Sequence, residues 1–131
     1  MGYLTSKPPS RELDSQIATE IFGLAISCDA TTGIWTSWHP KVPTKRYHMP
    51  HYSTNLDHSS GVVHWLQDRK FFLDSGSFVR NDNEMVWRAR FFRNPDHKPD
   101  HVEGLSLSHV ICLAAIDCLD RYPDDFHTLP Y

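Results

Sequence analysis

The chain has 131 residues, of which 40% are hydrophobic and 22% are charged. This length suits one domain, and this composition excludes a disordered chain because it supplies enough apolar residues for a core. The formal net charge of −3 excludes a general duplex-DNA binder, which usually carries a basic excess.

The first third of the chain predicts a tail, one helix and a long loop. Residues 1–9 form the tail, and Ser10 opens a helix whose apolar residues recur at three- and four-residue spacing. Gly23 ends this helix, because glycine tolerates the left-handed conformation that follows a last turn. Residues 24–52 show no clear period and are predicted to be mostly irregular, although residues 34–38 could form a short strand. A loop this long in a small domain is often functional.

The middle of the chain predicts a second helix and a β-hairpin. Ser53 or Thr54 is expected to cap the helix, which should end near Arg69. Residues 71–79 and 84–92 predict the two strands of an antiparallel hairpin. In the second strand the side chains alternate, so one face is predicted to be buried and the other to carry two arginines.

The last helix is the element around which we expect the domain to be organised. Residues 106–122 are apolar over more than half of the helix circumference, so this helix is predicted to be mostly buried. Ser106 or Ser108 can cap its start, and Pro123 ends it. A polar loop at residues 93–104 is expected before it.

Together these elements predict a single α+β domain over residues 10–122, between tails at residues 1–9 and 123–131. A hairpin alone is marginal in water, so it needs helices on one face. We therefore expect a small α/β/α-type sandwich, in which an antiparallel hairpin or small sheet packs against about three helices.

Three short motifs resemble those of one known family. They are Glu12-Leu13-Asp14 followed by Ile17-Ala18 and a closing Gly23, then Pro50-His51-Tyr52-Ser53-Thr54-Asn55-Leu56, and His109-Val110-Ile111-Cys112-Leu113-Ala114-Ala115. On these residues the chain resembles the phage ABA-sandwich domain family over roughly residues 10–120. The resemblance implies a layered α/β sandwich and an origin in a bacteriophage or prophage, and it implies no established activity. The chain departs from the family pattern at His51 and Asn55 and in its aromatic loop at residues 31–47.

The sequence has no pattern that is typical of a catalytic or metal site. Histidines form close pairs at His48 and His51 and at His97 and His101, but neither pair has the cysteine or carboxylate partners of a zinc site. Ser53 lacks the glycine-flanked turn of a nucleophilic serine, and there is no glycine-rich phosphate loop. We therefore expect no catalytic set, no metal and no cofactor, and we rank a histidine-dependent hydrolase last.

Aromatic and basic residues instead gather in the long loop and at the helix start after it, and two arginines lie on the predicted strand. Aromatic rings stack on bases, basic groups bind phosphates, and the hydroxyls and free amides of a helix start suit an anion. The candidate ligand-binding residues are Trp35, Trp38, Lys45, Arg46, Tyr47, Tyr52, Ser53, Thr54, Arg88 and Arg90. Alternatively, the aromatic residues pack a second small core or an oligomer interface.

These residues favour a non-enzymatic accessory protein that binds a small anionic, nucleotide-type ligand in a pocket formed by the 31–54 loop. Sequestration of a host immune signalling nucleotide is one version, and it follows from the implied phage origin rather than from any residue. The alternative is an inhibitor of a host protein that uses the same aromatic loop as its interface, because Tyr, Trp and Arg are enriched in hot spots. The sequence leaves open whether the chain forms a homo-oligomer, and neither duplex DNA nor a membrane is an expected partner.

The expected location is the cytoplasm of the host bacterium. No apolar run approaches the ~20 residues that cross a bilayer, and the start of the chain lacks the apolar segment of a signal peptide. The three cysteines are an odd set, which is typical of a protein in a reducing compartment.

Overall fold

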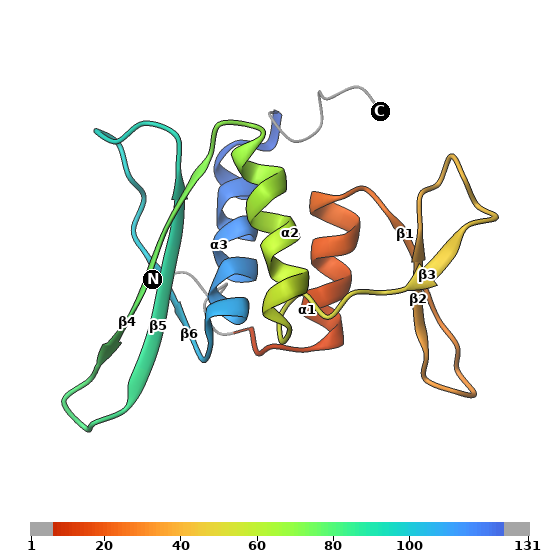
Figure 1. Cartoon of the computed structure of the whole chain (residues 1–131), viewed down its shortest axis with the longest axis horizontal. Helices are drawn as coiled ribbons and strands as arrows, with labels where there is room; N and C mark the ends of the chain where they lie inside the picture. The colour runs from red at the N-terminus through yellow and green to blue at the C-terminus, as the bar shows by residue number, and fades with distance from the viewer. Residues whose placement is uncertain (1–6, 125–131) are drawn as a thin grey trace.

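The computed structural model describes residues 7–124, which fold into helices between two small antiparallel sheets (Figure 1). In chain order the elements are α1 (Arg11–Gln16) with its π-helical continuation η2 (Ile17–Ile21), β1 (Ala25–Cys28), β2 (Trp35–Trp38), β3 (Arg46–His48), α2 (Leu56–Gln67), β4 (Phe72–Val79), β5 (Met85–Phe92), β6 (Val102–Gly104) and α3 (Leu107–Arg121). The sheets have the orders β1-β2-β3 and β4-β5-β6. The prediction of an α+β domain, with an antiparallel sheet packed against three helices, is confirmed. Residues 1–6 of the first predicted tail and residues 125–131 of the second lie outside the described part of the chain.

The first helix follows its predicted boundaries. Ser10 caps α1, because its hydroxyl accepts a hydrogen bond from the Leu13 N–H at 3.2 Å. The helix ends in the wider η2 turn, and Gly23 then has φ +66°, which glycine adopts without strain. Leu13, Ile17 and Ile21 are buried, so this helix contributes one apolar side to the core.

The long segment between α1 and α2 is a small sheet, so the prediction of mostly irregular chain is wrong. β1 and β3 both pair antiparallel with β2. The Asp29 carboxylate closes the β1–β2 turn by accepting bonds from the N–H groups of Thr31 and Thr32 at 2.8 and 3.2 Å, and Gly33 there has φ +71°. Strands of three or four residues are too short to show a period of two, which is why the pattern indicates a strand only at residues 34–38.

The second helix begins later than predicted. Asn55 caps α2 by accepting a hydrogen bond from the His58 N–H at 3.2 Å, so the prediction that Ser53 or Thr54 caps this helix is wrong. The Ser53 hydroxyl is unavailable for capping because it is bonded to the backbone of Ser10. The carboxyl end of α2 lies close to the predicted boundary.

The predicted hairpin is present, and a third strand extends it. β4 and β5 pair along their whole length, and β6 pairs with β5 inside the segment at residues 93–104, where the prediction of a loop without a strand is wrong. Ala89 and Phe91 are buried against the helices, as the alternation predicts. The alternation also places Met85 on this face, yet Met85 is 59% exposed because its end of the hairpin extends past the helices (Figure 1).

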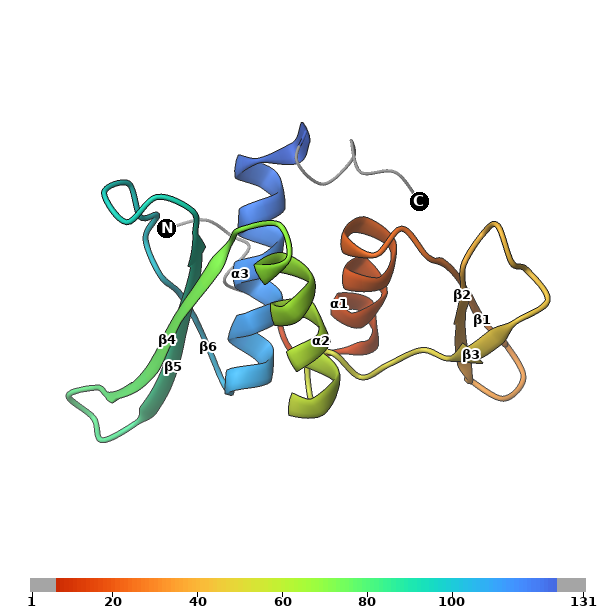
Figure 2. The same cartoon turned by 45° about the horizontal axis from the view of Figure 1, so that its top comes forward.

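α3 is the most buried element, as predicted. Ser106 caps it by accepting a hydrogen bond from the His109 N–H at 3.1 Å, and residues 110–116 are all buried. The helix packs against β5 and β6 on one side and against α2 on the other (Figure 2). It therefore joins the β4-β5-β6 sheet to the other helices in one core.

Candidate functional site

The structure divides the predicted binding residues among three places. Trp35, Trp38, Arg46 and Tyr47 lie on the β1-β2-β3 sheet with Lys45 just before β3, Tyr52, Ser53 and Thr54 lie between β3 and α2, and Arg88 and Arg90 lie on β5. The helices stand between the two sheets in both views (Figures 1 and 2), so the two arginines of β5 do not join the residues of the long loop. These residues therefore do not share one pocket.

Tyr52 and Ser53 are parts of the core. Tyr52 is 6% exposed and stacks on Phe22 with ring centroids 5.5 Å apart, and burial raises the pKa of its hydroxyl to about 12. Ser53 is fully buried, and its hydroxyl accepts from the Ser10 N–H at 3.0 Å and donates to the Ser10 carbonyl at 3.2 Å. Thr54 alone of these three residues is exposed. The hydroxyls of Tyr52 and Ser53 are therefore not available to a ligand.

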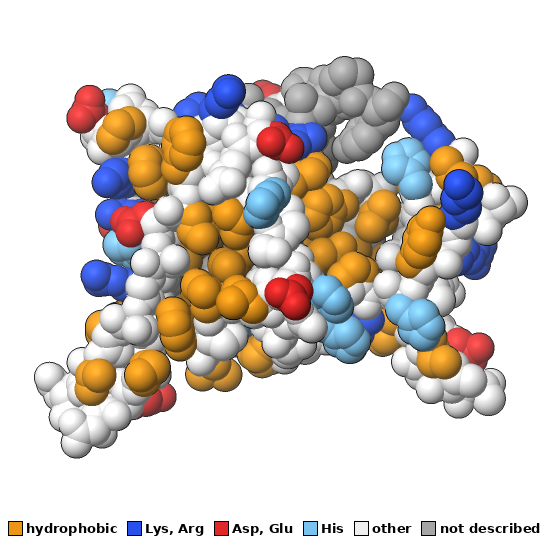
Figure 3. All heavy atoms as spheres, in the orientation of Figure 1, with side chains coloured by type: hydrophobic (Ala, Val, Ile, Leu, Met, Phe, Trp, Pro, Cys, Tyr) orange, Lys and Arg blue, Asp and Glu red, His pale blue; other side chains and the backbone are white. Residues whose placement is uncertain are grey.

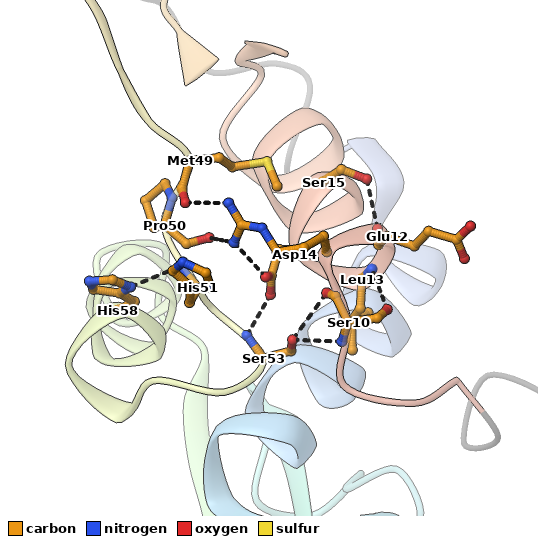
Figure 4. Close-up of polar contacts among 11 residues, drawn as sticks. Ser10, Glu12, Leu13, Asp14, Ser15, Met49, Pro50, His51, Ser53 and His58 are labelled. Carbon is orange, nitrogen blue, oxygen red and sulfur yellow. Dashed lines mark hydrogen bonds and ion pairs between the residues drawn. The ribbon is translucent and has the colours of Figure 1, made fainter. Parts of the chain in front are cut away.

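A buried polar cluster holds the start of α1 to the segment that leads into α2 (Figure 4). Asp14 is 1% exposed, and its carboxylate accepts from the Arg11 guanidinium at 2.8 Å and from the Ser53 N–H at 2.7 Å. Arg11 also donates to the carbonyls of Met49 at 2.6 Å and Pro50 at 3.0 Å. A buried carboxylate is tolerated when its charge is paired and its oxygens are hydrogen-bonded, and both conditions hold here.

This polar cluster gives two of the motif segments a structural role. Asp14 belongs to the first motif and Ser53 to the second, and the two residues are 39 positions apart in sequence. Their side chains and backbone groups bind each other rather than solvent. Asp14 and Ser53 therefore fix the fold and do not form an open site.

The segment at residues 24–52, which we call the aromatic lobe, presents the exposed aromatic and basic residues. The Arg46 guanidinium lies 3.9 Å from the centre of the Trp38 ring, and Tyr47 on the edge strand β3 is 64% exposed. Trp35 is partly buried and packs against the core. The lobe has three Lys and Arg residues and one carboxylate, so it is formally +2 in a chain of net charge −3.

Arg90 is held by an ion pair on the face of the β4-β5-β6 sheet that points away from the helices. It donates to the Asp74 carboxylate at 2.9 and 2.8 Å and to the Pro99 carbonyl at 3.1 Å. Hydrogen bonding from Arg90 lowers the pKa of Asp74, whereas burial and the nearby Arg90 charge lower the pKa of His101, which lies 3.3 Å from the same carboxylate. Arg88 differs from Arg90, because it has no ion pair among the described residues.

His109 is a buried residue whose role the sequence did not indicate. Its Nε2 lies 2.6 Å from the Lys7 carbonyl, and its Nδ1 accepts from the Leu105 N–H at 3.0 Å, so the first nitrogen is the donor. Burial lowers the pKa of His109. A Cβ at Gly104 would lie 2.6 Å from Nδ1, so glycine at that position is the one signal that a close contact exists there.

A pocket of about 380 Å³ lies beside this histidine. Its lining includes Lys7, Arg80, Met85, Leu105 and His109, and it contains none of the predicted binding residues. Both ring nitrogens of His109 are already hydrogen-bonded, so this histidine offers the pocket no free polar atom.

The described residues contain no group of three or more His, Cys, Asp or Glu side chains that could hold a metal ion. Cys112 and Cys118 are buried, and burial raises the pKa of the Cys112 thiol, which is therefore uncharged near neutral pH. In this part of the chain no helix combines the length and the apolar character that crossing a membrane requires.

Comparison with protein-family models, curated proteins and solved structures found no match. The resemblance to the phage ABA-sandwich family therefore depends on the sequence motifs alone, and it stays a prediction.

Proposed function

We propose that this chain is a small binding protein without catalytic activity, of phage origin as its motifs imply, and that the aromatic lobe binds a partner protein in the cytoplasm of the host bacterium. One observation carries the proposal. All residues of the edge strand β3 are exposed, and this strand carries Tyr47 on one face of the sheet and, on the other face, the Arg46 side chain that stacks on Trp38.

The chemistry of this strand suits a protein interface. Tyr, Trp and Arg are the residue types enriched at interface hot spots. β3 pairs only with β2 among the described strands, so its other edge offers backbone N–H and C=O groups to an extended segment of a partner. Because the lobe carries a formal charge of +2, it favours an acidic partner surface.

A nucleotide-type ligand is the second candidate, and the exposed ring of Tyr47, with the cations Lys45 and Arg46 close to it in sequence, favours it. A base would stack on the ring and the cations would meet a phosphate. This candidate ranks second because Arg46 covers a face of the Trp38 ring and Trp35 packs against the core. Sequestration of a host immune signalling nucleotide is the version of this candidate that suits a phage protein.

Tyr47→Ala tests the proposal against Leu105→Ala, a matched control on a residue that is 69% exposed and lies outside the lobe. Wild type and both variants are used to purify partners from bacterial lysate, and the captured proteins are measured by quantitative mass spectrometry and then titrated individually. We expect Tyr47→Ala to weaken one partner by roughly thirtyfold or more, the effect of a hot spot of ~2 kcal/mol. Leu105→Ala should keep that partner.

The same three proteins are melted in the presence of a panel of nucleotides. A melting shift of the wild type that Tyr47→Ala removes would replace the protein partner with the second candidate. If Tyr47→Ala binds every captured partner with wild-type affinity, and no nucleotide shifts the melting temperature of the wild type, both candidate functions are contradicted.

A further inference from the structure

β4 is the longest of the strands that lie at the edge of a sheet. The orders β1-β2-β3 and β4-β5-β6 leave β1, β3, β4 and β6 at edges. β4 has eight residues, whereas the other edge strands have three or four. The free edge of a strand presents backbone N–H and C=O groups on which another strand can form, and the risk grows with the length of the edge.

β4 also lacks the features that usually prevent an edge strand from pairing with another chain. Such features are lysine, proline, a β-bulge or an uncompensated charge. Residues 72–79 read Phe-Leu-Asp-Ser-Gly-Ser-Phe-Val, and their register with β5 is uninterrupted. Asp74 is the one charged residue of this strand, and it is paired with Arg90. In the space-filling view, white atoms of the backbone and of uncharged polar side chains predominate along the hairpin at the lower left (Figure 3).

The hydrogen-bond pattern shows which residues of β4 are available for pairing. The Arg80 N–H donates to the Glu84 carbonyl at 2.9 Å, directly beyond the last residues of the β4–β5 ladder. Bonded and non-bonded pairs alternate along an antiparallel ladder, so every second residue of β4 bonds to β5 and the others direct their N–H and C=O groups away from it. These outward-directed residues are Leu73, Ser75, Ser77 and Val79.

The sequence of β4 is complementary to itself about Ser75. When two copies of β4 are related by a two-fold axis at Ser75, they run antiparallel, and Phe72 of one copy faces Phe78 of the other. Phe72 is 48% exposed, so it gains a cross-strand aromatic pair. Asp74 faces Gly76, so no like charges are opposed. The neighbouring register, centred on Gly76, places the charged Asp74 opposite Phe78 instead.

We propose that β4 pairs with β4 of a second copy of this chain about a two-fold axis at Ser75, which joins the two β4-β5-β6 sheets into one continuous antiparallel sheet. Ser75 bonds to its own copy and the Leu73–Ser77 pair occurs twice, so three pairs of two bonds each give about six backbone hydrogen bonds. The aromatic lobe lies at the opposite end of the molecule (Figure 1), so each copy keeps its lobe free. The proposal therefore does not depend on the protein partner proposed above.

Disulfide cross-linking tests the two-fold axis directly. The background is Cys28→Ser, because Cys28 is exposed whereas Cys112 and Cys118 are buried. In this background Ser75→Cys should form an intermolecular disulfide on mild oxidation, because the facing Cα atoms of a hydrogen-bonded pair are about 5.5 Å apart, within the range of a disulfide.

Val79→Cys in the same background is the matched control, because Val79 is also exposed and directed outward on β4. It lies four positions from the axis, so its two copies are separated by eight positions, or about 27 Å, along the strands. Val79→Cys should therefore stay monomeric on a non-reducing gel. Cross-linking of Ser75→Cys that does not exceed that of Val79→Cys would overturn the proposal.

Sedimentation velocity of the full chain tests whether the backbone of β4 holds the dimer. Wild type should sediment as a dimer at about 100 μM, a concentration that detects a micromolar dissociation constant. Ser77→Pro removes an N–H that points away from β5, so it should fold and sediment as a monomer, whereas Ser77→Ala keeps this N–H and should stay a dimer. A monomeric wild type, or the same mass for both variants, would overturn the proposal. A dimer that Tyr47→Ala dissociates would assign the interface to the aromatic lobe and would overturn it as well.

Charge substitutions at the axis give a readout that a folding defect does not imitate. Ser75→Lys and Ser75→Glu each oppose two like charges, so each variant alone should dimerise up to roughly fivefold more weakly than wild type. An equimolar mixture of the two variants opposes unlike charges and should recover dimers of one copy of each. A mixture that dimerises no better than either variant alone would contradict a two-fold axis at Ser75.

Discussion

Asp14 connects two segments of the chain that sequence separates widely. Its carboxylate pairs with Arg11 on the same helix and accepts the Ser53 N–H from the segment before α2. Arg11 extends the connection to two backbone carbonyls after β3. Through these bonds the pair of Asp14 and Arg11 fixes where the aromatic lobe rejoins the helices.

We expect Asp14→Ala to lower the free energy of unfolding by about 2–4 kcal/mol, because it leaves the buried Ser53 N–H without an acceptor and removes the anion that pairs with Arg11. Urea denaturation followed by tryptophan fluorescence measures this change. Glu12→Ala is the matched control, since Glu12 is exposed and points away from the cluster (Figure 4). Equal stability of the Asp14→Ala and Glu12→Ala variants would show that the cluster does not stabilise the fold.

At the scale of single elements, the predicted and the observed capping residue differ at the start of α2. Asn55→Ala should cost about 1 kcal/mol, because the first turn loses the side-chain acceptor for the His58 N–H. Thr54→Ala should leave stability within about 0.5 kcal/mol of wild type, the usual range for an exposed substitution that removes no cap. Thermal and urea unfolding of the two variants decide the point, and a larger loss in Thr54→Ala would restore the predicted cap.

The elements that the sequence predicts well are those long enough to show a period. The alternation in β5 and the broad apolar surface of α3 indicate both elements close to their observed bounds. β1, β3 and β6 have three or four residues each, so neither their pairing nor their existence can be seen in a local pattern. Their partners lie in other strands, and only the folded chain brings them together.

The candidate site was only partly predictable for a related reason. Aromatic and basic residues at positions 35–54 indicate an unusual segment, and the structure does place several of them on one exposed sheet. The sequence does not show that Ser53 bonds to Ser10 or that Tyr52 stacks on Phe22, so two buried residues were included among the ligand-binding candidates. Arg88 and Arg90 were grouped with the loop residues only because they are basic, although the helices keep the two surfaces apart.

At the scale of the whole molecule, the helices form a middle layer and each sheet lies at one end (Figure 1). This arrangement leaves a surface of each sheet open to solvent. The aromatic lobe exposes Tyr47 and the Arg46–Trp38 stack, and the face of the β4-β5-β6 sheet that points away from the helices exposes Phe72 and Arg88. The described residues of one α+β domain therefore present two chemically distinct surfaces.

The binding role of the aromatic lobe is tested most directly by photo-crosslinking in bacterial cells that produce the protein. A benzophenone side chain replaces Tyr47 in one variant and Leu105 in another, two positions of similar exposure at 64% and 69%. After irradiation, adducts are separated by mass and identified by mass spectrometry. The account predicts a discrete protein adduct from position 47 that is absent from position 105. The absence of an adduct at position 47, or the same adducts from both positions, would contradict it.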